Sequence, residues 1–174
     1  MPDPAFPPGA ALVMPILSAK ARAVPATSLP AHAPFGPVVE RQLAACRRNG
    51  TSLVVLSIGL GGLEAVRQCH GNAVESQLLH AVWNRLRSRL RASDLAVRHG
   101  SAEFGAILLN AAGPAAAIVD ARLSEALSEP YGIGAREIVI SIRTGVAAYP
   151  LAGSTGDALV QAAIQARLAG ANAI

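Results

Sequence analysis

Apolar residues recur at regular spacings from about Phe35 onward, and the spacing changes along the chain. The run Leu53–Ile58 is continuously apolar apart from one serine and contains β-branched residues, which predicts a buried strand. The segment Val74–Leu90 carries apolar residues at helical spacing, which predicts a long amphipathic helix. Two short apolar runs flank the segment His99–Glu103, a pattern typical of a β-hairpin.

The other expected elements complete an alternation of helices and strands. A helix over Val38–Arg48 is expected to end at Asn49-Gly50, and Gly59–Gly62 is expected to turn the chain after the first strand. The remaining expected elements are a helix at Leu63–Cys69, strands at Leu95–Arg98 and Phe104–Leu109, a helix at Pro114–Leu127, an extended run at Glu137–Ala147, and a helix at Asp157–Leu168 stopped by Gly170. This order predicts an α/β (α+β) fold with a mixed central sheet flanked by helices.

Proline divides the chain into two parts. Eight of the 12 prolines fall within Met1–Pro34, so we expect a flexible Pro/Ala-rich arm at residues 1–34 and a folded domain at residues 35–174. The apolar stretch Ala10–Leu17 is interrupted by Pro15 and preceded by Asp3, which argues against a signal peptide. No apolar run is long enough to span a bilayer, so we expect no membrane insertion.

Composition and charge narrow the function classes. The formal net charge is only +4, Lys20 is the sole lysine, and 3% of residues are aromatic. No basic stripe with interleaved aromatic residues is present, so we expect neither DNA nor RNA as a partner. Cys46 and Cys69 have no metal-ligand spacing and form no disulfide framework, which indicates a reducing, cytoplasmic location.

Four segments stand out in order along the chain: LVVLSIGLGGL at Leu53–Leu63, RASDLAVRHGSAEF at Arg91–Phe104, RTGVAAYP at Arg143–Pro150 and ARLAGAN at Ala166–Asn172. Taken together, they resemble the GGDEF (diguanylate cyclase-like) domain of bacterial signalling proteins. The second segment matches the RxxD and GGDEF motifs in register, and the resemblance extends over residues 35–172. It implies a nucleotidyl-cyclase palm with a β-hairpin at the GGDEF motif.

The departures from the family pattern fall on the carboxylates. The resemblance implies two divalent cations held by an aspartate after the first strand and by the acidic pair of the hairpin. Gly59 and Gly61 stand at the acidic positions of the strand. In the hairpin, the motif reads Gly100, Ser101, Ala102, Glu103 and Phe104. Mg²⁺ is usually bound through one or two carboxylates, and Glu103 alone cannot supply the ligands of a two-metal site. We therefore expect no Mg²⁺ cofactor, no catalytic residue and no enzyme activity. Glu103 is expected to be vestigial and Phe104 to lie in the core.

The retained pair Arg91 and Asp94 is the strongest candidate for a binding site. In the family, RxxD is the inhibitory site that binds cyclic di-GMP, and arginine and carboxylate groups suit guanine edges and phosphates. The same pair can instead form a surface salt bridge or a helix-terminal cap. Arg85, Arg87, Arg89 and Arg98 can add phosphate contacts or form a solvated basic face, and Arg167 stands where the family has a phosphate-binding lysine.

Three functional hypotheses follow. The first is a non-catalytic GGDEF-like regulatory module that binds cyclic di-GMP through its RxxD site. The second is a ligand-free scaffold for an unidentified protein partner, and the third is an active diguanylate cyclase. The oligomeric state stays open.

Overall fold

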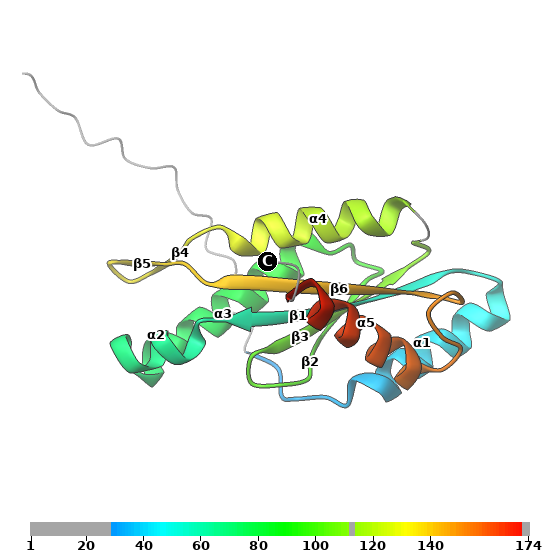
Figure 1. The fold of residues 1–174 in the computed structure, drawn as a ribbon, viewed down its shortest axis with the longest axis horizontal. Coiled ribbons are helices and arrows are strands. Elements are labelled where there is room, and N and C mark those ends of the chain that lie inside the picture. The colour runs from blue at the N-terminus through cyan, green and yellow to red at the C-terminus, as the bar shows by residue number, and fades with distance from the viewer. Residues whose placement is uncertain (1–28, 112–113, 172–174) are drawn as a thin grey trace, which may run out of the picture.

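In the computed structural model, residues 29–111 and 114–171 are described, and they form a central sheet with helices on both faces (Figure 1). The helices are α1 (Phe35–Asn49), α2 (Leu63–His70), α3 (Asn72–Arg89), α4 (Pro114–Ser128) and α5 (Gly156–Ala171). The strands are β1 (Leu53–Gly61), β2 (Leu95–Arg98), β3 (Glu103–Leu109), β4 (Tyr131–Ile133), β5 (Arg136–Ile138) and β6 (Ser141–Tyr149). The predicted α+β class is confirmed.

The central sheet has the order β2-β3-β1-β6, and each neighbouring pair is antiparallel. The expected mixed sheet is therefore corrected to an antiparallel one. Each helical crossover passes over one strand: β1 connects through α2 and α3 to β2, and β3 lies between them. Likewise β3 connects through α4 to β6, with β1 between them. Strands that run in the same direction thus never become neighbours.

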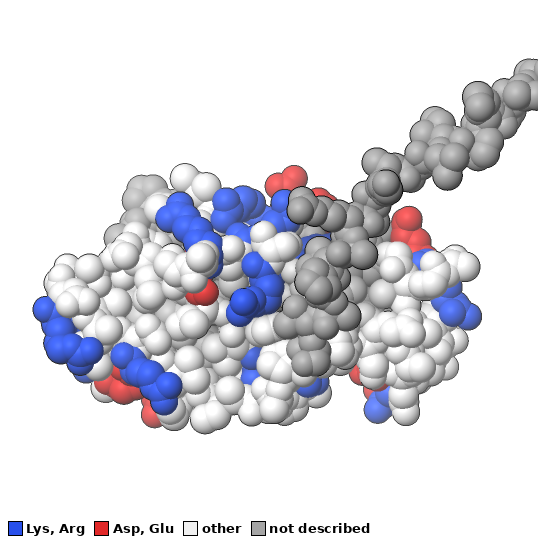
Figure 2. Space-filling view, turned by 180° about the vertical axis from the view of Figure 1, so that it is seen from behind, with Lys and Arg blue, Asp and Glu red and all other residues white. Residues whose placement is uncertain are grey.

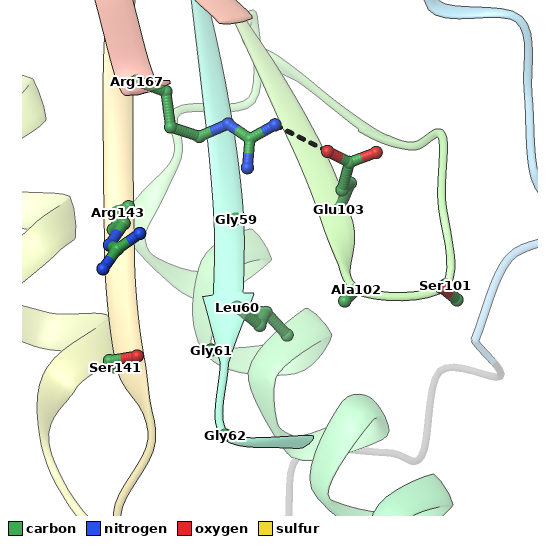
Figure 3. A pocket seen from close by; sticks show the side chains of 10 residues that line it. All are labelled: Gly59, Leu60, Gly61, Gly62, Ser101, Ala102, Glu103, Ser141, Arg143 and Arg167. Atoms are coloured by element: carbon green, nitrogen blue, oxygen red, sulfur yellow. Dashed lines mark hydrogen bonds and ion pairs between the residues drawn. The ribbon is translucent and has the colours of Figure 1, made fainter. Parts of the chain in front are cut away.

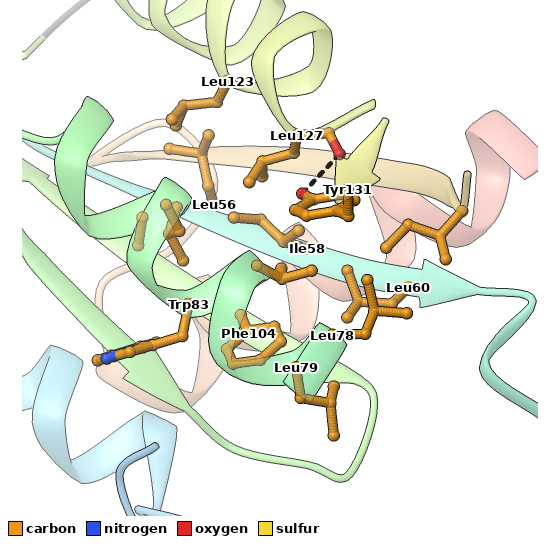
Figure 4. Packing of buried hydrophobic residues seen from close by; sticks show 14 of the residues in the cluster. Leu56, Ile58, Leu60, Leu78, Leu79, Trp83, Phe104, Leu123, Leu127 and Tyr131 are labelled. Carbon is orange, nitrogen blue, oxygen red and sulfur yellow. Dashed lines mark hydrogen bonds between the residues drawn. The ribbon is translucent and has the colours of Figure 1, made fainter. Parts of the chain in front are cut away.

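Strand β1 is the centre of the molecule and is buried on both faces. Side chains alternate along a strand, so Val54, Leu56 and Ile58 face one apolar cluster while Leu53 and Val55 face the other. The first cluster contains side chains of α3 and α4, and the second contains those of α1 and α5. Helices covering both faces explain why this strand is apolar except for Ser57, as predicted, and does not alternate between apolar and polar residues. Figure 4 shows the first cluster.

Several predicted element boundaries differ from those observed in the structure. Strand β1 does not end at Ile58 but continues to Gly61, because Gly59 and Gly61 both pair with residues of β6. The expected extended run at 137–147 divides into the end of β5 and most of β6, and β5 pairs with β4 as a separate two-stranded sheet. Helix α5 continues through Gly170, which was expected to stop it, to Ala171.

The residues just before α1 contact the edge of the sheet. Ala33 donates a backbone hydrogen bond of 2.8 Å to the carbonyl of Arg98, and Leu29 packs against the first cluster. Most of the expected arm, including Ala10–Leu17, lies outside the described residues. Among the helices described, none combines the length and the apolar character needed to cross a membrane.

Candidate functional site

A cavity of about 570 Å³ opens where the end of β1 meets the hairpin before β3 (Figure 3). It is formed by parts of four elements that lie far apart in the sequence. Its lining residues are Gly59, Leu60, Gly61, Gly62, Ser101, Ala102, Glu103, Ser141, Arg143 and Arg167. The structure thus brings together the predicted strand positions and three of the five predicted hairpin residues.

Three residues form a row across the sheet at the mouth of this cavity. Gly59 pairs with Glu103 on one side and with Arg143 on the other. Paired residues of neighbouring strands point to the same face, and here that face is the one covered by α5, because Leu53 and Val55 on the same side of β1 pack against α5. Arg167 reaches from α5 over Gly59, and its Nη2 donates to Oε1 of Glu103 at 2.5 Å (Figure 3). The lining therefore carries one carboxylate and two guanidinium groups.

The absence of side chains at two glycines places Arg167 in the cavity. A Cβ atom built at Gly145 of β6 would overlap the backbone of Ala163 and Arg167. Helix α5 can therefore approach β6 this closely only if position 145 is glycine. A Cβ atom at Gly59 would overlap Nη1 of Arg167. The guanidinium thus fills the space beside β1 that a side chain at position 59 would need.

The predicted hairpin residues divide between structure and cavity. Phe104 is fully buried and lies 5.9 Å from Trp83, centroid to centroid, so its expected place in the core is confirmed. The backbone N–H groups of His99 and Gly100 both donate to the Glu103 carbonyl at 3.2 Å and close the turn. Ser101 and Ala102 line the cavity, and Glu103, expected to be vestigial, is the acceptor for Arg167.

His99 connects the hairpin to α1 and is largely buried. Its ring stacks on Phe35 with centroids 4.9 Å apart, and its Nε2 lies 3.3 Å from the Phe104 carbonyl. Burial lowers the pKa of the His99 imidazole below its ordinary value of 6.5, and the guanidinium of Arg167 and the nearby His32 act in the same direction. The Glu103 carboxylate and the Phe104 carbonyl oppose this shift without cancelling it.

We expect the chain to lose stability as the pH falls below about 6.5. The pKa of His99 is lower in the folded chain than in the unfolded chain, so the unfolded chain binds more protons in this window. The stabilisation is complete above the unfolded pKa and is lost as the pH falls through the folded one. Urea unfolding at pH 7.5 and pH 6 measures the change, and in His99→Phe, which retains an aromatic ring on Phe35, it should be smaller. An equal loss in both proteins would contradict the assignment.

The predicted binding pair adopts a turn after α3. The Asp94 carboxylate accepts the backbone N–H of Arg91 through Oδ2 at 3.0 Å and that of Leu109 through Oδ1 at 3.3 Å. The side chain of Arg91 is exposed, and the ion pairs found among the described residues do not join it to Asp94. The contacts therefore match neither structural alternative, because the Asp94 carboxylate joins the turn after α3 to β3 and does not cap the helix.

Arg122 is the residue that sequence reasoning missed at this second position. A small cavity of about 50 Å³ is lined by Arg91, Asp94, Asn110 and Arg122 among others, and Nη2 of Arg122 donates to the Arg89 carbonyl at 3.3 Å. Helix α4 places Arg122 there, 31 residues beyond Arg91 in the chain. No local spacing signals such a contact, because only the packing of α4 beside α3 and the sheet creates it.

Two of the four other arginines expected near this site make structural contacts. Arg85 donates to the carbonyls of Ala126, Glu129 and Pro130, at and just beyond the end of α4, and lies 3.7 Å from the ring centroid of Tyr131. Arg98 donates to the Pro30 carbonyl at 3.4 Å. We therefore correct the expectation that Arg85 and Arg98 are available for phosphate contacts. On the face shown in Figure 2, basic side chains form separate groups and not a continuous stripe.

Solved structures share this fold. A sensory box/GGDEF family protein from Caulobacter crescentus has a TM-score of 0.74 and 27% identity, with 80% of this chain and 91% of that chain covered. Among curated proteins, the bifunctional diguanylate cyclase/cyclic di-GMP phosphodiesterase MucR of Pseudomonas aeruginosa is 33% identical over 135 residues, or 77% of this chain. The cyclic di-GMP phosphodiesterase NbdA of the same organism is 30% identical over 135 residues, or 78% of this chain.

The chain spans only a small part of these relatives, since the match covers 20% of the length of MucR and 17% of the length of NbdA. Residues 25–172 match the family described as diguanylate cyclase, GGDEF domain, which is most of the chain. Together with the antiparallel sheet and the hairpin before β3, this match shows that the chain belongs to the GGDEF-domain family.

Proposed function

We propose that this chain is a regulatory GGDEF module that binds cyclic di-GMP at Arg91, Asp94 and Arg122 and does not synthesise it. The observation that carries the proposal is the contrast between its two sites. The cavity at Gly59 has one carboxylate, already paired with Arg167, whereas the second site keeps an exposed arginine, a carboxylate and a further arginine together.

The donor set of the larger cavity supports the absence of catalysis. Two-metal chemistry needs two cations about 3.5–4 Å apart, each held by hard oxygen ligands. Glu103 is the only carboxylate among the lining residues. Among the described residues, no three histidine, cysteine, aspartate or glutamate side chains are grouped so that they could hold a metal ion. The residues present do not fit a pair of divalent cations. The cavity therefore has no catalytic role in the proposed function.

The chemistry of the smaller site suits a guanine nucleotide. A carboxylate has about four lone-pair positions, and two backbone N–H groups use one on each oxygen of Asp94. The other positions can accept the N1–H and N2–H₂ groups of a guanine. The planar guanidinium groups of Arg91 and Arg122 can donate in pairs to guanine O6 and N7 or to a phosphate. Two arginines and one aspartate also favour an anionic ligand.

Calorimetry with cyclic di-GMP tests the binding half of the proposal. We expect binding to the intact chain and at least a roughly tenfold loss of affinity in Arg91→Ala, since a hydrogen bond to a charged group contributes about 1.5–3 kcal/mol and a tenfold change corresponds to about 1.4 kcal/mol. This variant is well suited because Asp94 accepts the backbone N–H of residue 91, which alanine retains. Arg136→Ala, on the separate hairpin, is the matched control. No heat from the intact chain would favour the scaffold hypothesis instead.

Incubation with GTP and Mg²⁺ or Mn²⁺ tests the other half. We expect no cyclic di-GMP above the background of a heat-denatured sample. Product that forms at a steady rate, and that Glu103→Gln abolishes, would overturn the proposal and restore the active cyclase hypothesis.

A further inference from the structure

The larger cavity contains a positive charge, the guanidinium of Arg167, whose position depends on α5, β1 and β3. The side chain of Arg167 comes from α5, crosses above β1 and bonds to Glu103 at the start of β3. It is only 12% exposed, whereas Glu103 is 41% exposed. Arginine does not lose its proton in proteins, so the Glu103 carboxylate has a permanent counter-ion within the chain.

We infer that the Arg167 guanidinium excludes divalent metal ions from this cavity, because its ion pair with Glu103 already satisfies the carboxylate that an ion would need. The inference rests on the proposed lack of a metal centre and adds a cause to it. The missing carboxylates are then only one of two features that separate this cavity from a two-metal site, and the second is Arg167. Carboxylates restored at positions 59 and 102 would not assemble a metal site while Arg167 is in place.

The geometry around Gly59 supports this exclusion. A side chain at position 59 would project directly into the guanidinium of Arg167. The Nε of Arg167 is buried and has no hydrogen-bond partner among the described residues, so a new carboxylate would find a free donor within reach. Such a carboxylate would pair with arginine and not with a metal ion. Arg143, on the opposite side of Gly59 in the ladder, adds a second charge that repels cations.

Binding of Mn²⁺ alone, followed by electron paramagnetic resonance of the free ion, tests the inference. The variants are Gly59→Asp with Ala102→Asp, and the same pair combined with Arg167→Gln. We expect the intact chain and the double variant to bind Mn²⁺ weakly or not at all. The triple variant should bind at least about ten times more tightly than the double variant, which corresponds to 1.4 kcal/mol.

Adding Arg143→Gln to the double variant provides the matched control. It removes the same charge from the same cavity, but Arg143 has no ion pair among the described residues, so the gain should be clearly smaller. Circular dichroism checks that each variant is folded. Arg167→Met, which retains most of the packing over Gly59, replaces Arg167→Gln if the latter unfolds.

Two results would overturn different statements. Equal Mn²⁺ affinity in the double and triple variants, or an equal gain from Arg143→Gln, would refute the exclusion by Arg167 and leave the proposed function intact. Tight Mn²⁺ binding by the intact chain, together with turnover of GTP, would refute the proposed function itself.

Discussion

Replacement of Phe104 by alanine is expected to lower the free energy of unfolding by about 3–5 kcal/mol, the largest single effect that we predict. Phe104 is fully buried among residues of α3 and β1 and lies against Trp83 (Figure 4). Truncation would remove its buried apolar surface and leave a cavity that the antiparallel sheet cannot close by local movement. Urea unfolding followed by circular dichroism measures the loss.

Phe104→Leu is the matched control, because leucine fills most of the same space. It should cost clearly less than the alanine variant, about 1–2 kcal/mol. Similar losses in the two variants, or a loss below about 1 kcal/mol in Phe104→Ala, would show that the ring does not pack as the structure has it.

Gly145→Ala is expected to destabilise the chain by about 3 kcal/mol, at the upper end of the cost of inserting one methyl group into a well-packed region. The added Cβ would overlap backbone atoms of Ala163 and Arg167, which cannot rotate away as the end of a side chain can. Helix α5 must therefore move off β6. The movement should also weaken the ion pair between Arg167 and Glu103, because that pair depends on where α5 lies.

Gly132→Ala is the comparison for this substitution, since a Cβ atom built at Gly132 of β4 would have nothing within 4 Å. Its effect on the free energy of unfolding should stay within about 0.5 kcal/mol. If the two glycine variants were equally stable, α5 would not need the close approach at position 145.

Sequence patterns predicted the parts of the fold that depend on local periodicity and burial. The apolar run of β1, the long helix α3 and the hairpin before β3 all stand near their expected positions. The predicted end of β1 was wrong, because the local pattern of glycines at 59–62 is typical of a turn. In the structure, hydrogen-bonded neighbours on both sides hold Gly59 and Gly61 in the ladder.

The two sites were predictable to different degrees. Arg91 and Asp94 lie three residues apart on one turn, so a local motif sufficed to select them. The roles of Arg85 and Arg122 depend on how α4 packs beside α3, and each contact joins residues more than 30 positions apart. Their side chains have no distinguishing feature in a chain with 14 arginines.

Residue types alone establish which groups can meet at the larger cavity: glycine at positions 59 and 61, the carboxylate of Glu103, and the arginine at position 167. The position of Arg167 over Gly59 and its pairing with Glu103 depend on tertiary packing, because α5 lies close to β6 at Gly145, which has no side chain. Residue types follow from the chain, whereas the distance between charges follows from packing, and Coulomb interactions depend on that distance.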